Sequence, residues 1–277
     1  MRYSGNSPFA TDVIVLSDVH LGTYGCHARE LVNYLRHRAP KVLVLNGDIV
    51  DGWQFSKRYW PKSHNNVLIE IMKMISNGTV VYYLTGNHDE MLRRFSDFNI
   101  GNFHLADKLV LELGDKRAWI FHGDVFDLSV NKGKWIAKFA GKSYDYLILL
   151  NRAVNWMLEK LGREKISLSK KVKAGVKKAV SFIGDFEETA ASHAIDQGYD
   201  YVICGHIHQP QKRIITTNKG SVLYLNSGDW IENLTALEYA NGNWSVYQYE
   251  EKNIDLYKST LPEKINHEMT YSLNFSK

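Results

Sequence analysis

The sequence predicts an α/β protein with mixed sheets, and three features of its pattern support that prediction. Short apolar runs rich in β-branched residues recur along the chain, each followed by a polar cluster, which is typical of buried strands. The early runs alternate with helical segments, as in folds built on parallel strands. The late runs follow one another without helices, which favours antiparallel pairing.

The individual elements follow from these patterns in chain order. Helices are expected over 28–37 and 65–76, because apolar residues such as Leu68, Ile71 and Ile75 recur at helical spacing. A hairpin turn is expected at Asn241-Gly242-Asn243. The expected strands cover residues 12–17, 42–46, 80–84, 108–113, 118–122, 201–205, 222–226, 235–239 and 244–249.

Residues 131–191 lack strand signals and are expected to form a helical insertion between two strands. Apolar residues recur at helical spacing there as far as Gly162, and glycine often ends a helix. A lysine-rich run without acidic residues follows, from Lys165 to Lys178. The sequence therefore predicts one domain over 1–250 that carries the insertion, with 251–277 as a C-terminal extension of unassigned role.

Composition and length exclude several classes of protein. The chain has 277 residues, 44% of them hydrophobic, and five prolines, which is enough for a full core and excludes disordered and fibrous proteins. Its two cysteines cannot form a disulfide framework, so a reducing compartment is expected. Because the sequence shows no signal-peptide h-region and no apolar run of about 18 residues, we expect a cytoplasmic protein.

The net charge of +4 says little about partners until its location is considered. The lysine-rich run admits two interpretations: a solvated helix face, or peripheral contact with anionic lipid or with a substrate phosphate. Nucleic acid is disfavoured, because the run lacks interleaved aromatic residues for base stacking. The sequence makes no prediction of the oligomeric state.

Seven side chains that bind hard or borderline metals follow the expected strands. In an open α/β sheet, ligand sites form outside the carboxyl ends of strands. Oxygen and imidazole ligands without nearby thiolates suit Mn²⁺, Fe or Zn²⁺ and argue against a closed structural zinc site. Two cations that share Asp48 would each have four protein ligands and leave positions for water and a phosphate, so a phosphoester-hydrolysing site is expected. The seven are Asp18, His20, Asp48, Asn87, His122, His206 and His208.

Five ordered motifs, spread over about residues 12–230, carry a resemblance to a known family. Together they resemble the signatures of the calcineurin-like metallophosphoesterase superfamily. The resemblance implies a four-layer α-β-β-α sandwich with two mixed sheets and a helical cap insertion. The motifs are Asp18-Val-His20, Gly47-Asp48-Ile-Val-Asp51, Gly86-Asn87-His88-Asp89, His122-Gly123-Asp124 and Gly205-His206-Ile-His208.

The same resemblance implies two divalent metal ions, Mn²⁺ in first place and Fe, Zn²⁺ or Mg²⁺ as alternatives. It gives catalytic roles to Asp48, as the bridge between the ions, and to His88, as a proton donor or a cation for phosphate charge. One ion would be held by Asp18, His20, Asp48 and His208, and the other by Asp48, Asn87, His122 and His206.

Three further segments are similar to the branch that contains the UDP-2,3-diacylglucosamine diphosphatases of lipid A synthesis. The branch implies that metal-bound hydroxide cleaves the pyrophosphate to UMP and an acylated sugar 1-phosphate, at the inner membrane surface. One position departs from it: the best-known members have arginine where this chain has His88. The segments are Ser17-Asp18-Val-His20-Leu-Gly22, Trp60-Pro-Lys-Ser-His64-Asn65 and Asn226-Ser-Gly-Asp-Trp230.

Two alternatives to that activity stay open. The first is a metallophosphodiesterase or phosphatase that acts on soluble nucleotides or phosphoproteins. The second is a non-catalytic scaffold that has kept the fold.

Further residues are assigned provisional roles around the site. Asp51 and Asp124 are expected either to orient histidine ligands or to cap a helix or turn. His64 and Asn65 are expected to contact substrate, with a helix cap at Asn65 or Ser63 as the alternative. Trp53 and Trp60 are expected to line a sugar or base pocket, or to pack in the core or on the surface. The residues assigned to acyl chains or lipid are Trp135, Phe139, Leu147, Trp156, Lys170 and Lys171.

Overall fold

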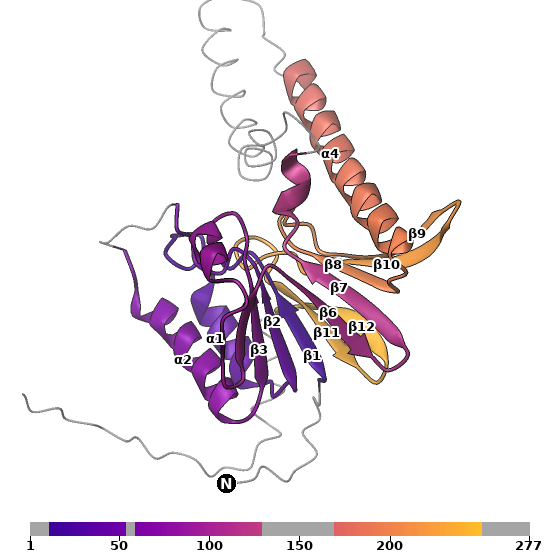
Figure 1. Ribbon diagram of the computed structural model, residues 1–277. Coiled ribbons are helices and arrows are strands. Elements are labelled where there is room, and N and C mark those ends of the chain that lie inside the picture. The colour runs from indigo at the N-terminus through magenta and orange to yellow at the C-terminus, as the bar shows by residue number, and fades with distance from the viewer. Residues whose placement is uncertain (1–10, 54–58, 129–168, 251–277) are drawn as a thin grey trace, which may run out of the picture.

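The computed structural model describes residues 11–53, 59–128 and 169–250, with the backbone alone at 127–128 and 169–180. The described chain forms four layers: a helical pair, a seven-stranded sheet, a five-stranded sheet and one long helix (Figure 1). Both sheets contain parallel and antiparallel pairs. The predicted α/β fold with two mixed sheets is therefore confirmed.

The seven-stranded sheet has the order β12-β11-β1-β2-β3-β5-β4. Its four central strands are parallel, and β11, β12 and β4 run antiparallel to their neighbours. Helices α1 and α2 cover its outer face (Figure 1). The bounds are β1 (Val13–Leu16), α1 (Ala28–Arg36), β2 (Val42–Asn46), α2 (Lys62–Ser76), β3 (Val80–Leu84), β4 (Asn99–Ile100), β5 (Phe103–Ala106), β11 (Thr235–Ala240) and β12 (Asn243–Gln248).

The five-stranded sheet has the order β6-β7-β8-β10-β9, with β7, β8 and β10 parallel. The C-terminal half of α4 packs on its outer face, and the helix extends beyond the sheet (Figure 1). The bounds are β6 (Lys108–Leu113), β7 (Lys116–Phe121), α4 (Ser169–Asp196), β8 (Tyr201–Cys204), β9 (Gln211–Thr217) and β10 (Gly220–Asn226). Two 3-10 helices, η1 (Glu90–Phe95) and η2 (Asp124–Leu128), follow β3 and β7.

Successive residues of each central strand face opposite sides of the sheet, and both sides are covered by other layers. In β1, Ile14 and Leu16 face the helical pair, whereas Val13 and Val15 face the other sheet. In β8, Ile203 lies between the sheets and Val202 lies against α4. Strands buried on both faces require continuous apolar runs, and those runs are the signal that predicted them.

The structure differs from the sequence prediction at several boundaries. Helix α2 begins three residues earlier than expected, at Lys62, and α4 continues to Asp196, beyond the expected end of the insertion at 191. Strands β4, β5 and β9 were not predicted. The expected hairpin turn is present, with φ of 52° at Asn241 and 79° at Gly242. Most of the predicted insertion, including Gly162, and the extension over 251–277 lie outside the described residues.

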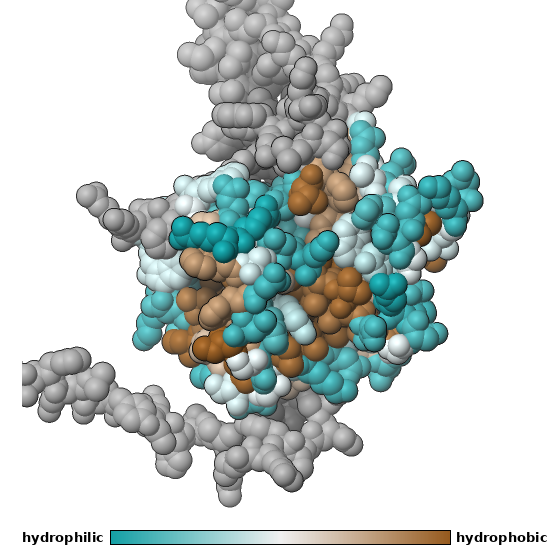
Figure 2. All heavy atoms as spheres, viewed as in Figure 1, coloured by the Kyte–Doolittle hydropathy of each residue, from teal (hydrophilic) through white to brown (hydrophobic). Residues whose placement is uncertain are grey.

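The described surface is mainly polar on the face seen in Figure 2, with apolar residues gathered in the middle of that face. Within the described part of the chain, no helix combines the length and the apolar character that crossing a membrane requires.

Candidate metal centre

The candidate ligands lie on loops that follow parallel strands, as the sequence predicts. Asp18 and His20 follow β1, Asp48 follows β2, and Asn87 and His88 follow β3. The other sheet contributes three imidazoles, because His122 follows β7, and His206 and His208 follow β8. The carboxyl ends of these strands meet at one edge of the sandwich, so two sheets contribute to a single site.

Asp48 lies at the centre of this arrangement. Its Oδ2 is 3.4 Å from Nε2 of His122 and 3.9 Å from Nε2 of both His20 and His88. Its Oδ1 accepts a hydrogen bond of 2.8 Å from the backbone N–H of His88, which fixes the carboxylate. One oxygen therefore faces imidazoles from three loops, as a ligand shared by two cations requires.

Asp18 holds the second part of the site. Its Oδ1 is 3.1 Å from Nε2 of His208, and its Oδ2 accepts a 3.0 Å hydrogen bond from the backbone N–H of His206. Among the described His, Cys, Asp and Glu residues, three groups bring their ligand atoms within 4.8 Å of one another. These groups are Asp18, His20 and His208; His20, Asp48 and His88; and Asp48, His122 and His206.

Buried polar atoms without hydrogen-bond partners test whether these residues fit metal ions. Such atoms are costly, because burial removes water without replacing it. Four of the eight in the described part of the chain belong to expected ligands: Asp18 Oδ1, His20 Nε2, Asn87 Oδ1 and His122 Nε2. Each is the atom through which that side chain would bind a cation, so the donor set fits a metal site.

The electrostatics of the site favour positive charge. Burial works to raise the pKa of Asp48 and to lower that of His122, but the mutual attraction of the pair prevails. The pKa of Asp48 is lowered, and the pKa of His122 is raised to about 10. The same opposition lowers the pKa of Asp18 and raises that of His208. A field that holds protons on buried imidazoles also attracts divalent cations.

Outer contacts orient the imidazoles toward the centre. The Nδ1–H of His122 donates to the carbonyl of Asn46 (2.9 Å), which leaves Nε2 as the free ligand atom. Asp51 Oδ2 lies 3.1 Å from Nδ1 of His20 and 3.0 Å from Nδ1 of His88. The geometry at Asp51 is the one expected of a residue that orients histidine ligands.

Two orienting residues had no role in the sequence prediction, although both stand in quoted motifs. Asp89 is fully buried and accepts hydrogen bonds from the backbone of Ile49 (3.0 Å) and Gly86 (2.6 Å), so it joins the loops after β2 and β3. Asp229 Oδ2 lies 3.6 Å from Nδ1 of His208. No local pattern marks Asp229 as a partner of His208, since only tertiary folding brings them together.

The backbone of the ligand loops is unusual. Positive φ is uncommon in residues other than glycine and clusters at functional sites. Five of the expected ligands adopt it, with φ between 52° and 66°. Motif glycines allow close packing beside them: a Cβ on Gly205 would lie 2.7 Å from Asp18 Oδ2, and one on Gly86 would meet Asp48 Oδ1. The five residues with positive φ are Asp18, His20, Asp48, His206 and His208.

Three further residues that the sequence assigns to the site lie at or just before the start of α2: Trp60, His64 and Asn65. His64 is buried in the first turn of α2, where its Nδ1 accepts a 2.9 Å hydrogen bond from the backbone N–H of Gly22. Asn65 Oδ1 accepts a 2.6 Å hydrogen bond from Trp60 Nε1. The N-cap of α2 is Pro61, so neither Ser63 nor Asn65 caps the helix.

Trp53 and Asp124 each contact a residue that follows β3. The ring of Trp53 stacks on that of His88, with centroids 4.4 Å apart. Asp124 begins η2 and pairs with Arg93 (3.1 Å). The residues assigned to acyl chains, Trp135, Phe139, Leu147 and Trp156, lie outside the described residues. Lys170 and Lys171 lie in the first turn of α4, where only the backbone is described.

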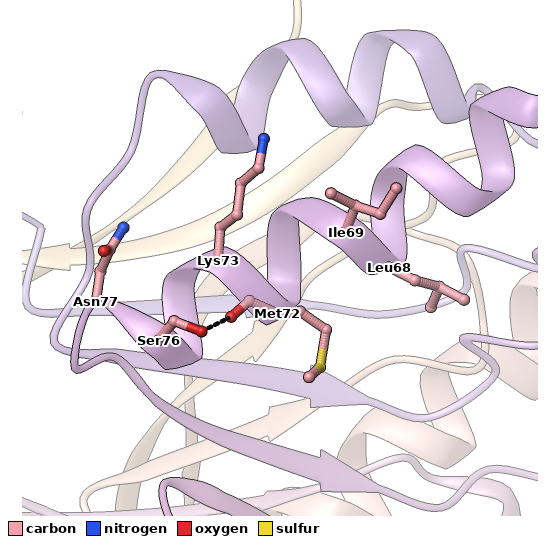
Figure 3. A pocket seen from close by; sticks show the side chains of 6 residues that line it. All are labelled: Leu68, Ile69, Met72, Lys73, Ser76 and Asn77. Atoms are coloured by element: carbon pink, nitrogen blue, oxygen red, sulfur yellow. Dashed lines mark hydrogen bonds between the residues drawn. The ribbon is translucent and has the colours of Figure 1, made fainter. Parts of the chain in front are cut away.

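An apolar groove of about 400 Å³ runs along α2, with Leu68, Ile69 and Met72 among its lining residues (Figure 3). Two of its lining residues are joined by a 2.9 Å hydrogen bond, which Ser76 Oγ donates to the carbonyl of Met72 (Figure 3). Its lining contains no carboxylate or imidazole, so the groove is separate from the candidate metal centre.

The fold and this cluster define a class of protein. The sequence profile of the family described as "Calcineurin-like phosphoesterase" matches residues 11–210, which include every candidate ligand. The chain belongs to this family and is a metal-dependent phosphoesterase.

Several curated proteins named "UDP-2,3-diacylglucosamine hydrolase" are similar to this chain at greater length. The protein of Aliivibrio fischeri is 24% identical over 87% of this chain and 99% of its own length. That of Aeromonas salmonicida is 25% identical over 85% of this chain and 92% of its own. Among solved structures, the E. coli phosphoesterase Yfce aligns with 86% of this chain and 99% of its own, at 13% identity and a TM-score of 0.39.

Proposed function

We propose that this chain hydrolyses the pyrophosphate of UDP-2,3-diacylglucosamine, or of a closely related lipid-linked substrate, to UMP and an acylated sugar 1-phosphate. The observation that carries the proposal is the extent of the similarity to the UDP-2,3-diacylglucosamine hydrolases. These alignments cover 84% or more of this chain and 92% or more of the relatives, and so extend beyond the family match at residues 11–210.

The residues of the site suit this chemistry. Asp18, His20, Asp48 and His208 would hold one divalent cation, and Asp48, Asn87, His122 and His206 the other. Bound there, the cations would neutralise phosphate charge and activate water; Mn²⁺ is preferred, with Fe, Zn²⁺ and Mg²⁺ as alternatives.

His88 would act from the rim of the site. Its Nδ1 lies 3.0 Å from Asp51 Oδ2, so a buried carboxylate faces the ring on the side away from Asp48. Its Nε2 lies on the Asp48 side, where it would donate a proton to the leaving oxygen or stabilise phosphate charge.

The insertion over 131–191 would serve as a cap for the acyl chains. Trp135, Phe139, Leu147 and Trp156 would provide its apolar surface, and Lys170 and Lys171 would meet anionic headgroups. This part of the proposal places the protein in the cytoplasm, at the periphery of the inner membrane.

Product analysis tests the proposal. Metal-free protein is incubated with UDP-2,3-diacylglucosamine, with and without Mn²⁺, and the products are resolved by mass spectrometry. We expect Mn²⁺-dependent release of UMP and acylated sugar 1-phosphate. Asp48→Asn is expected to lower the rate by about 1,000-fold or more, because several kcal/mol of charge stabilisation are lost. Asp115→Asn, in the exposed turn between β6 and β7, is the matched control and should keep the parent rate.

A second candidate function is hydrolysis of soluble nucleotides or phosphoproteins. The observation that favours it is His88, which stands where the best-known lipid A diphosphatases have arginine. A cyclic nucleotide and a phosphopeptide belong in the same assay. Turnover of either one, with none of the lipid, would keep the metal centre and reject the lipid substrate.

A further inference from the structure

The site has an aromatic wall beside the candidate metal centre. Trp53 lies over the imidazole of His88, with ring centroids 4.4 Å apart and planes inclined by 33°. The same imidazole faces Asp48, with His88 Nε2 3.9 Å from Asp48 Oδ2. The indole is nevertheless 55% exposed. It therefore engages the site through one face and remains accessible to a ligand.

The backbone that carries this indole is held by hydrogen bonds. The backbone N–H of Trp53 donates to Asp51 Oδ1 (3.1 Å), and that of Gly52 donates to the carbonyl of His88 (2.8 Å). Gly52 allows this close approach, because a Cβ there would lie 2.7 Å from the His88 carbonyl oxygen. The backbone of Trp53 is thus held in place before any ligand arrives, and its ring packs on that of His88, which lowers the entropy cost of binding.

A second pair of aromatic rings, Tyr24 and Tyr59, belongs to the loops that follow β1 and β2. Tyr24, four residues after the candidate ligand His20, is 82% exposed and stacks on Tyr59 with centroids 3.7 Å apart. His64 contacts the segments that carry both tyrosines, since its Nδ1 accepts a hydrogen bond from the backbone N–H of Gly22 and its ring meets that of Tyr59 edge to face. Tyr24 and Trp53 each have one ring partner among the described residues, but of these two partners it is His88, beneath Trp53, that faces Asp48.

A flat, fixed and half-exposed indole is suited to one class of ligand. The face of an aromatic side chain stacks on a planar ring, and the gain in binding free energy is similar for each nucleobase. The ring lies beside the place where a phosphate would bind, so the planar group must be attached to that phosphate through a short linker. A nucleoside 5′-phosphate has this arrangement.

We infer that Trp53 forms the base-binding wall of the substrate site, on which the nucleobase of a nucleoside phosphate stacks while its phosphate occupies the metal centre. The inference rests on the proposed function, which supplies uracil as the base. Trp53 then determines specificity for the nucleotide half of the substrate and takes no part in the chemical step.

Calorimetry with two product-side ligands tests this role. UMP and ribose 5-phosphate differ by the base, so the ratio of their Kd values for the Mn²⁺-loaded protein isolates the contribution of the ring. We expect the parent to bind UMP about 5- to 150-fold more tightly, which is the range of base stacking on an aromatic side chain. Trp53→Ala should abolish this preference and leave the Kd for ribose 5-phosphate within about twofold, whereas Trp53→Phe should keep most of it.

The control is Phe98→Ala, which removes an equally exposed ring, 52% accessible, from the segment before β4. It should keep the parent preference for UMP. Equal Kd values for UMP and ribose 5-phosphate in the parent would overturn the inference. So would a Trp53→Ala variant that weakens both ligands equally, since Trp53 would then only support His88.

Failure of the proposed function gives a different result. If UDP-2,3-diacylglucosamine is not hydrolysed but Trp53→Ala still abolishes the preference for UMP, the base-binding wall stands and the substrate is another nucleotide. If the lipid is hydrolysed and the preference is absent in the parent, the proposed function stands and the wall is rejected.

Discussion

A single carboxylate, Asp51, faces two imidazoles that come from different loops. Its Oδ2 lies 3.1 Å from Nδ1 of His20 and 3.0 Å from Nδ1 of His88, and its Oδ1 accepts from the backbone of Trp53. The residue is almost fully buried, so these contacts are little screened by water. Asp51 therefore couples a candidate ligand, a candidate proton donor and the aromatic wall.

Replacing Asp51 with asparagine should weaken metal binding without removing a ligand. The amide keeps the shape of the side chain but loses the negative charge that faces Nδ1 of His20. Loss of such an orienting carboxylate typically lowers metal affinity about 10- to 100-fold. Titration of metal-free protein with Mn²⁺ measures the change, with Asp115→Asn as the control in an exposed turn. Unchanged Mn²⁺ affinity in Asp51→Asn would show that the carboxylate serves packing alone.

At this scale the sequence predicts ligand identity better than it predicts the partners of those ligands. Asp18, His20 and Asp48 are visible because each lies within a few residues of the end of an apolar run. Asp229 is not, because its approach to His208 depends on how β10 pairs with β8 and where the next loop turns. Those contacts are set by tertiary packing, which a local pattern does not encode.

Among the strands, too, some were predicted from the sequence pattern and others were not. The central strands were predicted because both of their faces are buried, whereas β9 was missed because most of its residues are exposed. Its sequence, QKRIITT, contains two apolar residues, Ile214 and Ile215, and so carries no apolar run. The strands β4 and β5 are short, with two and four residues, and gave too little pattern to detect.

Helix α4 connects the surface of the second sheet to the metal centre through Phe186. This fully buried ring lies against Gly123, where a Cβ would come within 2.7 Å of it, and its centroid is 6.3 Å from that of His206. Phe186→Ala should therefore lower the free energy of unfolding by about 3–5 kcal/mol. Urea unfolding at a fixed Mn²⁺ concentration measures the loss.

The matched control for Phe186 is Val125→Ala, which shortens an exposed side chain in η2 and should change stability by less than about 0.5 kcal/mol. A loss below about 1 kcal/mol in Phe186→Ala would mean that the contact between α4 and the sheet depends on other residues.

Glu187, next along α4, should make stability depend on pH. Burial raises the pKa of Glu187 above its ordinary value of 4.5, although its ion pair with Arg213 opposes the shift. A raised pKa means that the folded state binds this proton more tightly than the unfolded chain does. The contribution of Glu187 is therefore favourable at low pH and is lost as pH rises through the raised pKa.

Thermal unfolding of Glu187→Gln checks this sign. The variant carries no titrating group there, so its Tm relative to the parent should rise between about pH 4 and pH 7. Glu188→Gln, one position further and exposed, should show no such trend. A Tm difference that falls with pH would mean that the pair with Arg213 outweighs burial.

For the whole molecule, the metal centre joins the two sheets. Asp18, His20, Asp48 and Asn87 come from the seven-stranded sheet, and His122, His206 and His208 from the five-stranded one. Two cations held between them would cross-link the sandwich at one edge. Since the unfolded chain cannot assemble this set, the binding energy of the cations adds to the stability of the fold.

Removing metal should therefore destabilise the whole sandwich and not the site alone. At a free Mn²⁺ concentration of 100 times Kd, each independent site contributes about 2.7 kcal/mol, so chelation should lower Tm and Mn²⁺ should restore it. Asp48→Asn loses the shared ligand and should respond weakly to Mn²⁺, whereas Asp115→Asn should respond like the parent. Scanning calorimetry shows whether the two sheets unfold together. A single transition whose Tm rises with Mn²⁺ means that the metal centre couples them. If neither the chelator nor Mn²⁺ changes Tm, the apolar layer between the sheets holds them together without the cations.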